Sequence, residues 1–158
     1  MSPQWAKRPW TMGMDMRNIL VATDGSEGAE RAVAFAAELA HALSAKLVIL
    51  AVSEPSISRD LEEFRRAEGS TIGDIVEADA AAHVKHAIEL ANNQGAMDIQ
   101  EVTRAGDPAH VILAVARDLA ADLVVVGKRG FGRVKGFALG SVSQNLAAHA
   151  DRIVVIVP

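Results

Sequence analysis

The sequence predicts an α/β fold, a Rossmann-like doubly wound five-stranded parallel sheet with four helices. Short apolar, β-branched runs alternate along the chain with longer segments in which apolar residues recur at helical spacing. Strands that alternate with helices require right-handed crossovers, which cover both faces of a parallel sheet. Half of the 158 residues are hydrophobic but few are aromatic, and such an aliphatic composition suits helices packed on a buried sheet.

The five expected strands are short apolar segments bounded by turn or capping residues. NILVAT opens the series and ends at DGSEG, a turn with helix-capping residues, while RIVVIVP is the last segment of the sequence. The expected strands cover residues 18–23, 46–52, 97–104, 121–127 and 152–158.

The four expected helices show apolar stripes and recognisable start and stop signals. Asp107 can cap the third helix, and Pro108 follows where a missing N–H costs nothing. Gly95, with the two asparagines before it, ends the second helix. The helices cover about residues 27–44 and 71–93, a segment that begins at Pro108, and about residues 141–149.

Domain organisation follows from the same pattern. Residues 1–16 have no period and are expected to form a loose tail, so that residues 17–158 form one domain. Residues 53–70 are polar and charged and are expected to be a long connection. No apolar run approaches the roughly 18 residues that cross a bilayer, and no signal-peptide core follows the N-terminus. These features favour a cytoplasmic protein that is not bound to a membrane.

Composition also excludes several kinds of site. The chain has no cysteine, so disulfides and cysteine-type zinc sites are absent. The formal net charge is −4, from 16 basic and 20 acidic residues, and it gives no reason to expect nucleic acid as a partner. His83 and His86 lie three residues apart on the second expected helix, but no third ligand with clear spacing accompanies them. We therefore expect no metal site formed by side chains.

A glycine-rich, basic stretch, GKRGFGRVKGFALGS (127–141), begins at the end of the fourth expected strand. It is not a Walker loop, because Gly127 and Lys128 are followed by Arg129 and no glycine precedes them at the required spacing. It fails the dinucleotide fingerprint G-x-G-x-x-G by one residue, and that fingerprint belongs in the first strand-to-helix turn. The spacing that it does contain is G-x2-G-x9-G-[ST], formed by Gly127, Gly130, Gly140 and Ser141.

This loop has the chemistry of a phosphate-binding site. At Gly127 and Gly130 we expect positive φ and a main chain that approaches a ligand without a Cβ in the way. Gly140 and Ser141 open the last helix, whose free N–H groups and positive dipole end suit a phosphate. The hydroxyls of Ser141 and Ser143 can each donate a further hydrogen bond. The alternative is that the glycines only permit a tight connection.

Basic side chains in the loop raise the local positive potential on an otherwise acidic protein, which favours a polyphosphate. The alternative for each of them is an ordinary solvated side chain. They are Lys128, Arg129, Arg133 and Lys135.

Asp24 supplies the second element of the expected site. In the strand order 3-2-1-4-5, the first and fourth strands are neighbours at the point where the order reverses, which is where doubly wound sheets bind ligands. The loops after these two strands would then face each other across one crevice. Asp24, at the end of the first strand, could accept hydrogen bonds from ribose hydroxyls. The alternative for Asp24 is a cap for the first helix, a role for which Ser26 competes.

Together, the glycine spacing, Asp24 and the order of strands and helices resemble the ATP-binding subgroup of the universal stress protein family. The resemblance runs from RNILVATDGSEGAERAVAFAAELA through AGDPAHVI and ADLVVVGKRG to the last strand. It implies that Asp24 contacts the nucleoside and that the backbone of Val52 contacts adenine. The residues that it implies around the base and the sugar are Ala22, Thr23, Val126 and Val142.

The resemblance also implies a function. We expect an ATP-binding stress-response switch or adaptor that forms a homodimer through its last strand, residues 152–157, with any Mg²⁺ held mainly by the phosphates. No general base or further metal-positioning acid can be placed in the loop, so we expect no catalytic residue and at most slow hydrolysis. The alternatives are a slow ATPase or autokinase, with Ser141 or Ser143 as the modified residue, and a structural dimer that does not bind ATP.

Overall fold

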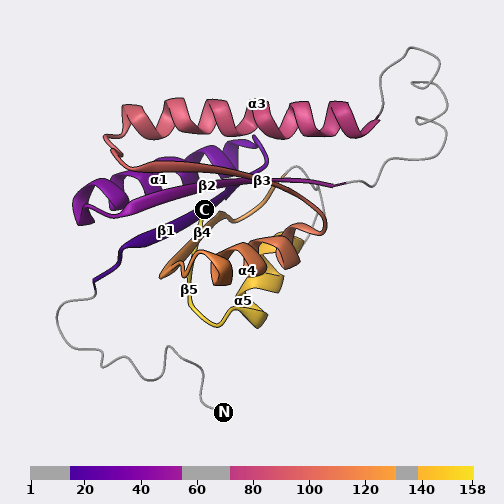
Figure 1. Ribbon diagram of the computed structural model, residues 1–158. Coiled ribbons are helices and arrows are strands. Elements are labelled where there is room, and N and C mark those ends of the chain that lie inside the picture. Colours follow the sequence, from indigo (N-terminus) through magenta and orange to yellow (C-terminus); the bar gives the residue numbers. More distant parts are fainter. Residues whose placement is uncertain (1–14, 55–71, 131–138) are drawn as a thin grey trace.

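The computed structural model describes residues 15–54, 72–130 and 139–158. The predicted tail, apart from its last two residues, and nearly all of the predicted connection at 53–70 lie outside these ranges. In sequence order the elements are β1 (Asn18–Thr23), α1 (Glu27–Leu43), β2 (Lys46–Ser53), α3 (Ile72–Asn93), β3 (Ile99–Ala105), α4 (Pro108–Asp118), β4 (Leu123–Gly127), α5 (Ser141–His149) and β5 (Ile153–Val157) (Figure 1).

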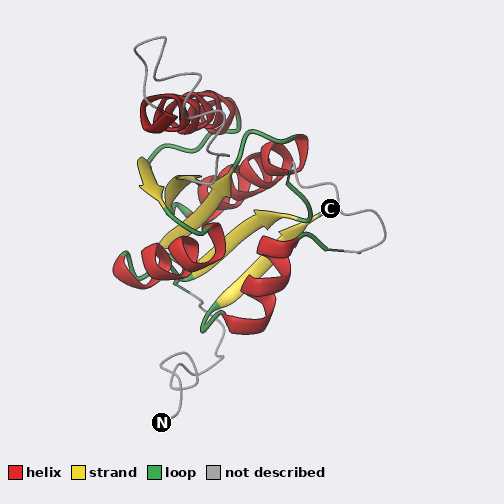
Figure 2. Ribbon diagram, turned by 90° about the vertical axis from the view of Figure 1, so that its right-hand side faces the viewer, coloured by secondary structure: helices red, strands yellow, loops and turns green. Residues whose placement is uncertain are grey.

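The five strands form one sheet in the order β3-β2-β1-β4-β5, and every neighbouring pair is parallel. β1 lies in the centre, with Leu20 opposite Val48 of β2 on one side and Val124 of β4 on the other. Helices α1 and α3 cover one face of the sheet, and α4 and α5 cover the other (Figures 1 and 2). The predicted fold and strand order are confirmed.

Alternating side chains of the central strands build a core on each face of the sheet. On the first face, Ile19 and Val21 pack with a stripe of small residues of α1 that includes Ala32, Ala36 and Ala40. Alanines let that helix approach the sheet closely, so the backbone of α1 lies near the strands. The second core is formed around aliphatic side chains of the strands and of α4 and α5, which include Leu20, Val48, Leu50, Ile112 and Leu146.

Local capping explains where the helices begin and end. The Oγ of Ser26 accepts a hydrogen bond from Ala29 N at 3.3 Å, and Oδ1 of Asp107 accepts one from His110 N at 2.9 Å. Gly95 ends the turn after α3 with φ of +88°, a conformation that favours glycine. The predicted caps at Asp107 and Gly95 are therefore confirmed. In the described ranges we find no helix long and apolar enough to cross a membrane.

Candidate functional site

The loops that follow β1 and β4 meet at the carboxyl edge of the sheet, because these strands are neighbours. Asp24, directly after β1, reaches the glycine-rich loop after β4: a Cβ built on Gly130 would overlap Oδ2 of Asp24. The carboxylate therefore lies against the bare Cα of Gly130. The two loops that the sequence placed across one crevice are in contact.

Asp24 is held in an exposed turn and does not cap α1. Its Oδ1 accepts a hydrogen bond from Ser26 N at 2.9 Å, and Ser26 itself is the N-cap of the helix. Thr23 is buried, and its Oγ1 accepts a hydrogen bond from Gly25 N at 3.2 Å. This turn fixes the backbone on both sides of Asp24, whose carboxylate lies against Gly130. Of the two roles considered for Asp24, the capping role belongs to Ser26.

Gly127 lacks a side chain because α1 lies against it. A Cβ on Gly127 would lie 2.7 Å from both the carbonyl carbon and the carbonyl oxygen of Gly28, and a Cβ on Gly28 would lie 2.6 Å from the carbonyl oxygen of Arg129. Strand β4 stays extended up to Gly127. The positive φ expected at Gly127 and Gly130 is wrong, because neither glycine is among those with positive φ. What these positions require is close approach and not a left-handed turn.

The base of the glycine-rich loop is closed by hydrogen bonds to Lys128. The Lys128 carbonyl oxygen accepts from Gly140 N at 2.9 Å and from the Ser143 hydroxyl at 3.0 Å, and Lys128 N donates to Val157 O at 2.6 Å. Ser143 is only 2% exposed, and its hydroxyl also lies 3.0 Å from Gly140 O. The phosphate contact predicted for Ser143 would require this hydroxyl to turn away from both carbonyl oxygens.

The N-terminus of α5 borders the same loop. Gly140 is the N-cap with an extended φ of −74° and no side-chain cap, and Ser141 is exposed in the first turn. The first N–H groups of a helix have no partner within it and carry partial positive charge. Lys128 is partly exposed and Arg129 exposed beside them. Arg133 and Lys135 lie outside the described residues. This end of the loop can receive an anionic group.

The residues predicted around a base and a sugar lie at the carboxyl ends of neighbouring strands and at the start of α5. Ala22, Val52 and Val142 are partly exposed and pack on the second core. Val126 is only 4% exposed, so its side chain belongs to the core and its backbone alone can face a ligand. Whether any of these residues binds a ligand stays a prediction.

The sequence did not predict the neighbours of the two histidines on α3. The ring of His83 packs on Gly25, and Nε2 of His86 lies 3.0 Å from Oε1 of Glu30 on α1. Among residues 15–54, 72–130 and 139–158, no group of three or more histidine, aspartate or glutamate side chains could hold a metal ion. The two histidines instead contact α1 and the turn before it.

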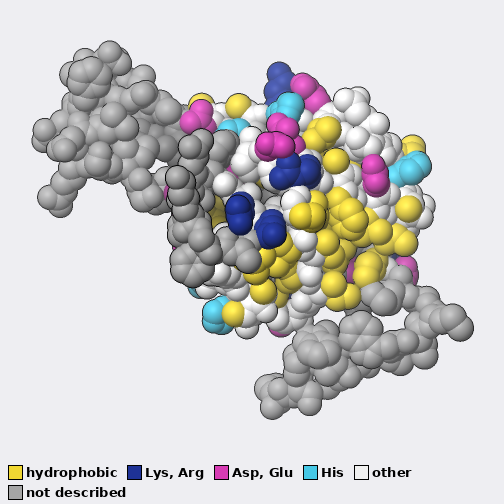
Figure 3. All heavy atoms as spheres, turned by 180° about the vertical axis from the view of Figure 1, so that it is seen from behind, with side chains coloured by type: hydrophobic (Ala, Val, Ile, Leu, Met, Phe, Trp, Pro, Cys, Tyr) yellow, Lys and Arg dark blue, Asp and Glu magenta, His cyan; other side chains and the backbone are white. Residues whose placement is uncertain are grey.

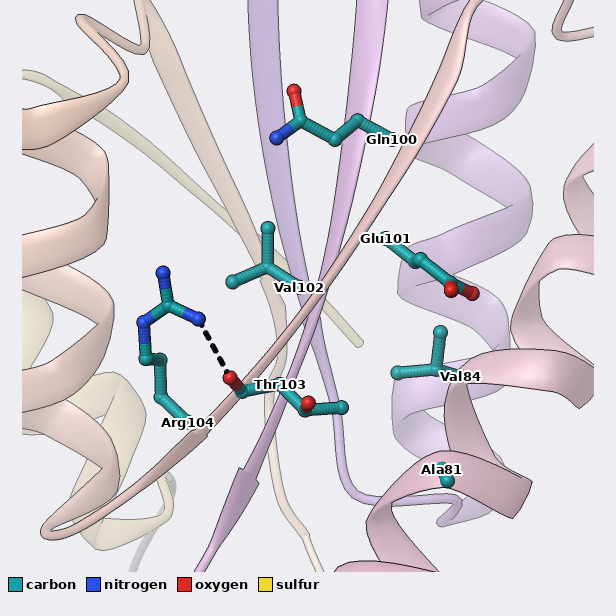
Figure 4. Close-up of a pocket in the computed structure, with 7 residues that line it drawn as sticks. All are labelled: Ala81, Val84, Gln100, Glu101, Val102, Thr103 and Arg104. Atoms are coloured by element: carbon teal, nitrogen blue, oxygen red, sulfur yellow. Dashed lines mark hydrogen bonds between the residues drawn. The ribbon is translucent and has the colours of Figure 1, made fainter.

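A hollow lies beside the edge strand β3 and is lined by residues of β3 and α3 (Figure 4). Arg104 in its wall donates a hydrogen bond to Thr103 O at 2.8 Å. Most of the side chains that line the hollow are polar and belong to the edge strand. Among the described residues, every buried side-chain nitrogen or oxygen atom has a hydrogen-bond partner. The lining residues are Ala81, Val84, Gln100, Glu101, Val102, Thr103 and Arg104.

Comparison with known proteins shows which protein family this chain is similar to. The model of the universal stress protein family matches residues 16–158. Universal stress protein Rv1636 of Mycobacterium tuberculosis is 32% identical over 145 residues, which cover 89% of this chain and 95% of that protein.

Solved structures agree with this comparison. A crystal structure of a universal stress protein in complex with cAMP has a TM-score of 0.70 and 32% identity, and the match covers 90% of this chain and 96% of that one. The universal stress protein from Archaeoglobus fulgidus in complex with dAMP shares the fold, with a TM-score of 0.66, 23% identity and coverage of 92% and 100%.

Proposed function

Because the protein belongs to the universal stress protein family, we propose that it binds an adenine nucleotide, ATP in the first place, in the crevice between the loops after β1 and β4. The observation that supports this proposal most directly is the contact between Asp24 and Gly130, which joins a carboxylate and a bare backbone at one point. A nucleotide needs an acceptor for its sugar hydroxyls and donors for its phosphates, and this crevice offers both chemistries.

The residues fit such a ligand in three groups. Asp24 would accept hydrogen bonds from the ribose, and the backbone of Val52, with Ala22, Thr23, Val126 and Val142, would surround the base. The phosphates would lie at the glycine-rich loop, where Ser141 is exposed and where the first amides of α5 have no partner within the helix. Lys128 and Arg129 would add positive potential. Any Mg²⁺ would be held mainly by the phosphates.

A cyclic nucleotide is the second candidate ligand. It is favoured by one specific observation, the 32% identity to a universal stress protein whose crystal structure is a complex with cAMP. The basic loop and the G-x2-G-x9-G-[ST] spacing favour a ligand with more negative charge than cAMP carries. We therefore place ATP first and cAMP second.

We propose that the protein acts in the cytoplasm, as predicted from the sequence, as a nucleotide-dependent switch or adaptor in the stress response. The described part of the crevice offers one carboxylate and several donors, which suits binding more than rapid cleavage. Slow ATP hydrolysis, or autophosphorylation at Ser141, remains the alternative activity of the same site.

Two experiments test the proposal. The first is calorimetric titration of the protein with ATP, ADP, AMP and cAMP. The second is acid extraction of the purified protein, followed by chromatography of any nucleotide that is released. Gly130→Val should weaken ATP binding at least about tenfold, because its side chain would fill the space against Asp24. Ala82→Val, at an exposed position of α3, is the control and should bind like the wild type.

The outcomes separate the candidates. Tighter binding of cAMP than of ATP would support the second ligand, and released ADP in excess of ATP would support slow hydrolysis. Absence of binding of every adenine nucleotide to the folded wild type would overturn the proposal.

We also propose that the protein forms a homodimer through β5. The strand is paired with β4 along one side and lies at the edge of the sheet, and all five of its apolar residues are partly exposed. The side of the molecule that carries β5 shows a broad hydrophobic area (Figure 3). An apolar edge strand of this kind is a liability unless it is covered.

A further inference from the structure

The ring of His83, on α3, rests on the middle of the turn that contains Asp24. A Cβ built on Gly25 would overlap Cδ2 of His83 and would lie 2.6 Å from its Nε2 and 3.0 Å from its Cγ. Gly25 also has φ of +77°, a conformation that L side chains rarely adopt. The absence of a side chain at Gly25 therefore serves two needs, a left-handed turn and contact with an imidazole ring.

The histidine is held in place from both sides along its helix. Ala80 and Val84 flank it in the sequence, and they are 6% and 2% exposed in a small core with Ala51 of β2. One turn further on, His86 Nε2 lies 3.0 Å from Glu30 Oε1 and ties α3 to α1. The backbone of α3 is thus anchored before and after His83. The helix that carries the ring cannot move away from Gly25 without disturbing one of these contacts.

The turn beneath the ring determines where the Asp24 carboxylate lies. Gly25 N donates to Thr23 Oγ1 at 3.2 Å, and Ser26 N donates to Asp24 Oδ1 at 2.9 Å. On its other side the carboxylate meets Gly130. Gly25 therefore connects a ring that is fixed on α3 to a carboxylate that faces the glycine-rich loop. A shift of the turn toward α3 would move Asp24 away from the crevice.

We propose that His83 is a positioning residue of the candidate nucleotide site, whose ring supports the turn at residues 23–26 and keeps Asp24 facing the glycine-rich loop. The proposal rests on the proposed function for the identity of the ligand. It assigns His83 no contact with that ligand. A small misplacement of a group that grips a ligand is enough to weaken binding.

Three variants of the full-length protein test this role. His83→Ala removes the support, and we expect ATP affinity to fall about three- to thirtyfold, mainly through faster dissociation. His83→Phe keeps a flat ring beside Gly25, and we expect it to restore affinity to within about threefold of the wild type. Glu89→Ala, at an exposed position of α3, removes neither the contact with the turn nor the contacts that anchor the helix, and we expect it to bind ATP like the wild type.

A double-mutant cycle tests the contact without any nucleotide. Gly25→Ala should lower the urea midpoint of the wild type, and it should lower the midpoint of the His83→Ala variant clearly less, because the overlap with the ring is gone and only the strained φ remains.

The results can be told apart from failure of the proposed function. If the wild type binds ATP and His83→Ala binds it equally well, the positioning role is wrong and the proposed function stands. Additive effects in the cycle, or no rescue by His83→Phe, would also overturn the role. If the folded wild type binds no adenine nucleotide, the proposed function and the role in binding are both overturned, while the cycle still reports whether the ring supports the turn.

Discussion

At the scale of single residues, two glycines of one loop lack a side chain for different reasons. Gly127 faces the backbone of Gly28 in α1, whereas Gly130 faces the carboxylate of Asp24. Backbone inside a helix can hardly move, but a carboxylate on an exposed turn can rotate. The same substitution should therefore affect folding at the first position and ligand binding at the second.

Gly127→Ala tests this difference. Its Cβ would lie 2.7 Å from two backbone atoms of Gly28, so β4 and α1 would have to separate, which should cost about 1–3 kcal/mol of unfolding free energy. Gly130→Ala, in the exposed part of the loop, should cost less than about 1 kcal/mol. Urea denaturation measures both, and equal destabilisation by the two variants would contradict the distinction.

At the scale of elements, the residues before β5 tie that strand to the end of α4. Arg152 is largely buried and donates a hydrogen bond to Ala121 O at 2.9 Å, and its guanidinium lies 2.8 Å from Asp151 Oδ1. Arg117 of α4 lies 3.6 Å from the other carboxylate oxygen. Partial burial by itself would raise the pKa of Asp151. The hydrogen bond from Arg152 and the charges of Arg152 and Arg117 have the opposite effect and outweigh burial, so the pKa of Asp151 lies below its ordinary value.

A lowered carboxyl pKa makes part of the stability depend on pH. The contribution of Asp151 is fully present above the ordinary pKa of an aspartate and is lost as the pH falls through the lower pKa of the folded state. Because the Asp151 side chain is 42% exposed to solvent, Asp151→Asn should reduce the unfolding free energy at pH 7 by less than about 1 kcal/mol. Urea titrations should show the difference from the wild type shrinking in strong acid, and a difference that grows there would contradict this assignment.

The elements themselves could be predicted from the sequence, whereas their contacts could not. Apolar periodicity indicated all five strands and four helices, with ends within a few residues. The same periodicity could also have predicted the burial of Ser143. Leu146, three residues later, lies on the same face of α5 and is fully buried. The contacts of Gly127 with Gly28 and of His83 with Gly25 join distant segments, and no local pattern encodes them.

At the scale of the whole molecule, the two edges of the sheet differ in chemistry. β3 exposes polar and charged residues, including Glu101 and Arg104, which protect an edge strand from pairing. β5 has only apolar, β-branched residues, and it lies on the side with the broad hydrophobic area (Figure 3). The edge that lacks protection is therefore the one expected to pair, and a two-fold axis would let one surface serve both copies.

Sedimentation velocity at micromolar concentration tests this arrangement. The wild type should sediment as a dimer, and Val155→Lys should shift it to the monomer, because a charge at the middle of β5 would be buried between the two copies. Met97→Lys adds the same charge at a residue that is 92% exposed before β3, so it should leave the dimer intact. A monomeric wild type would exclude the dimer, and a dimer that survives Val155→Lys would place the interface on another surface.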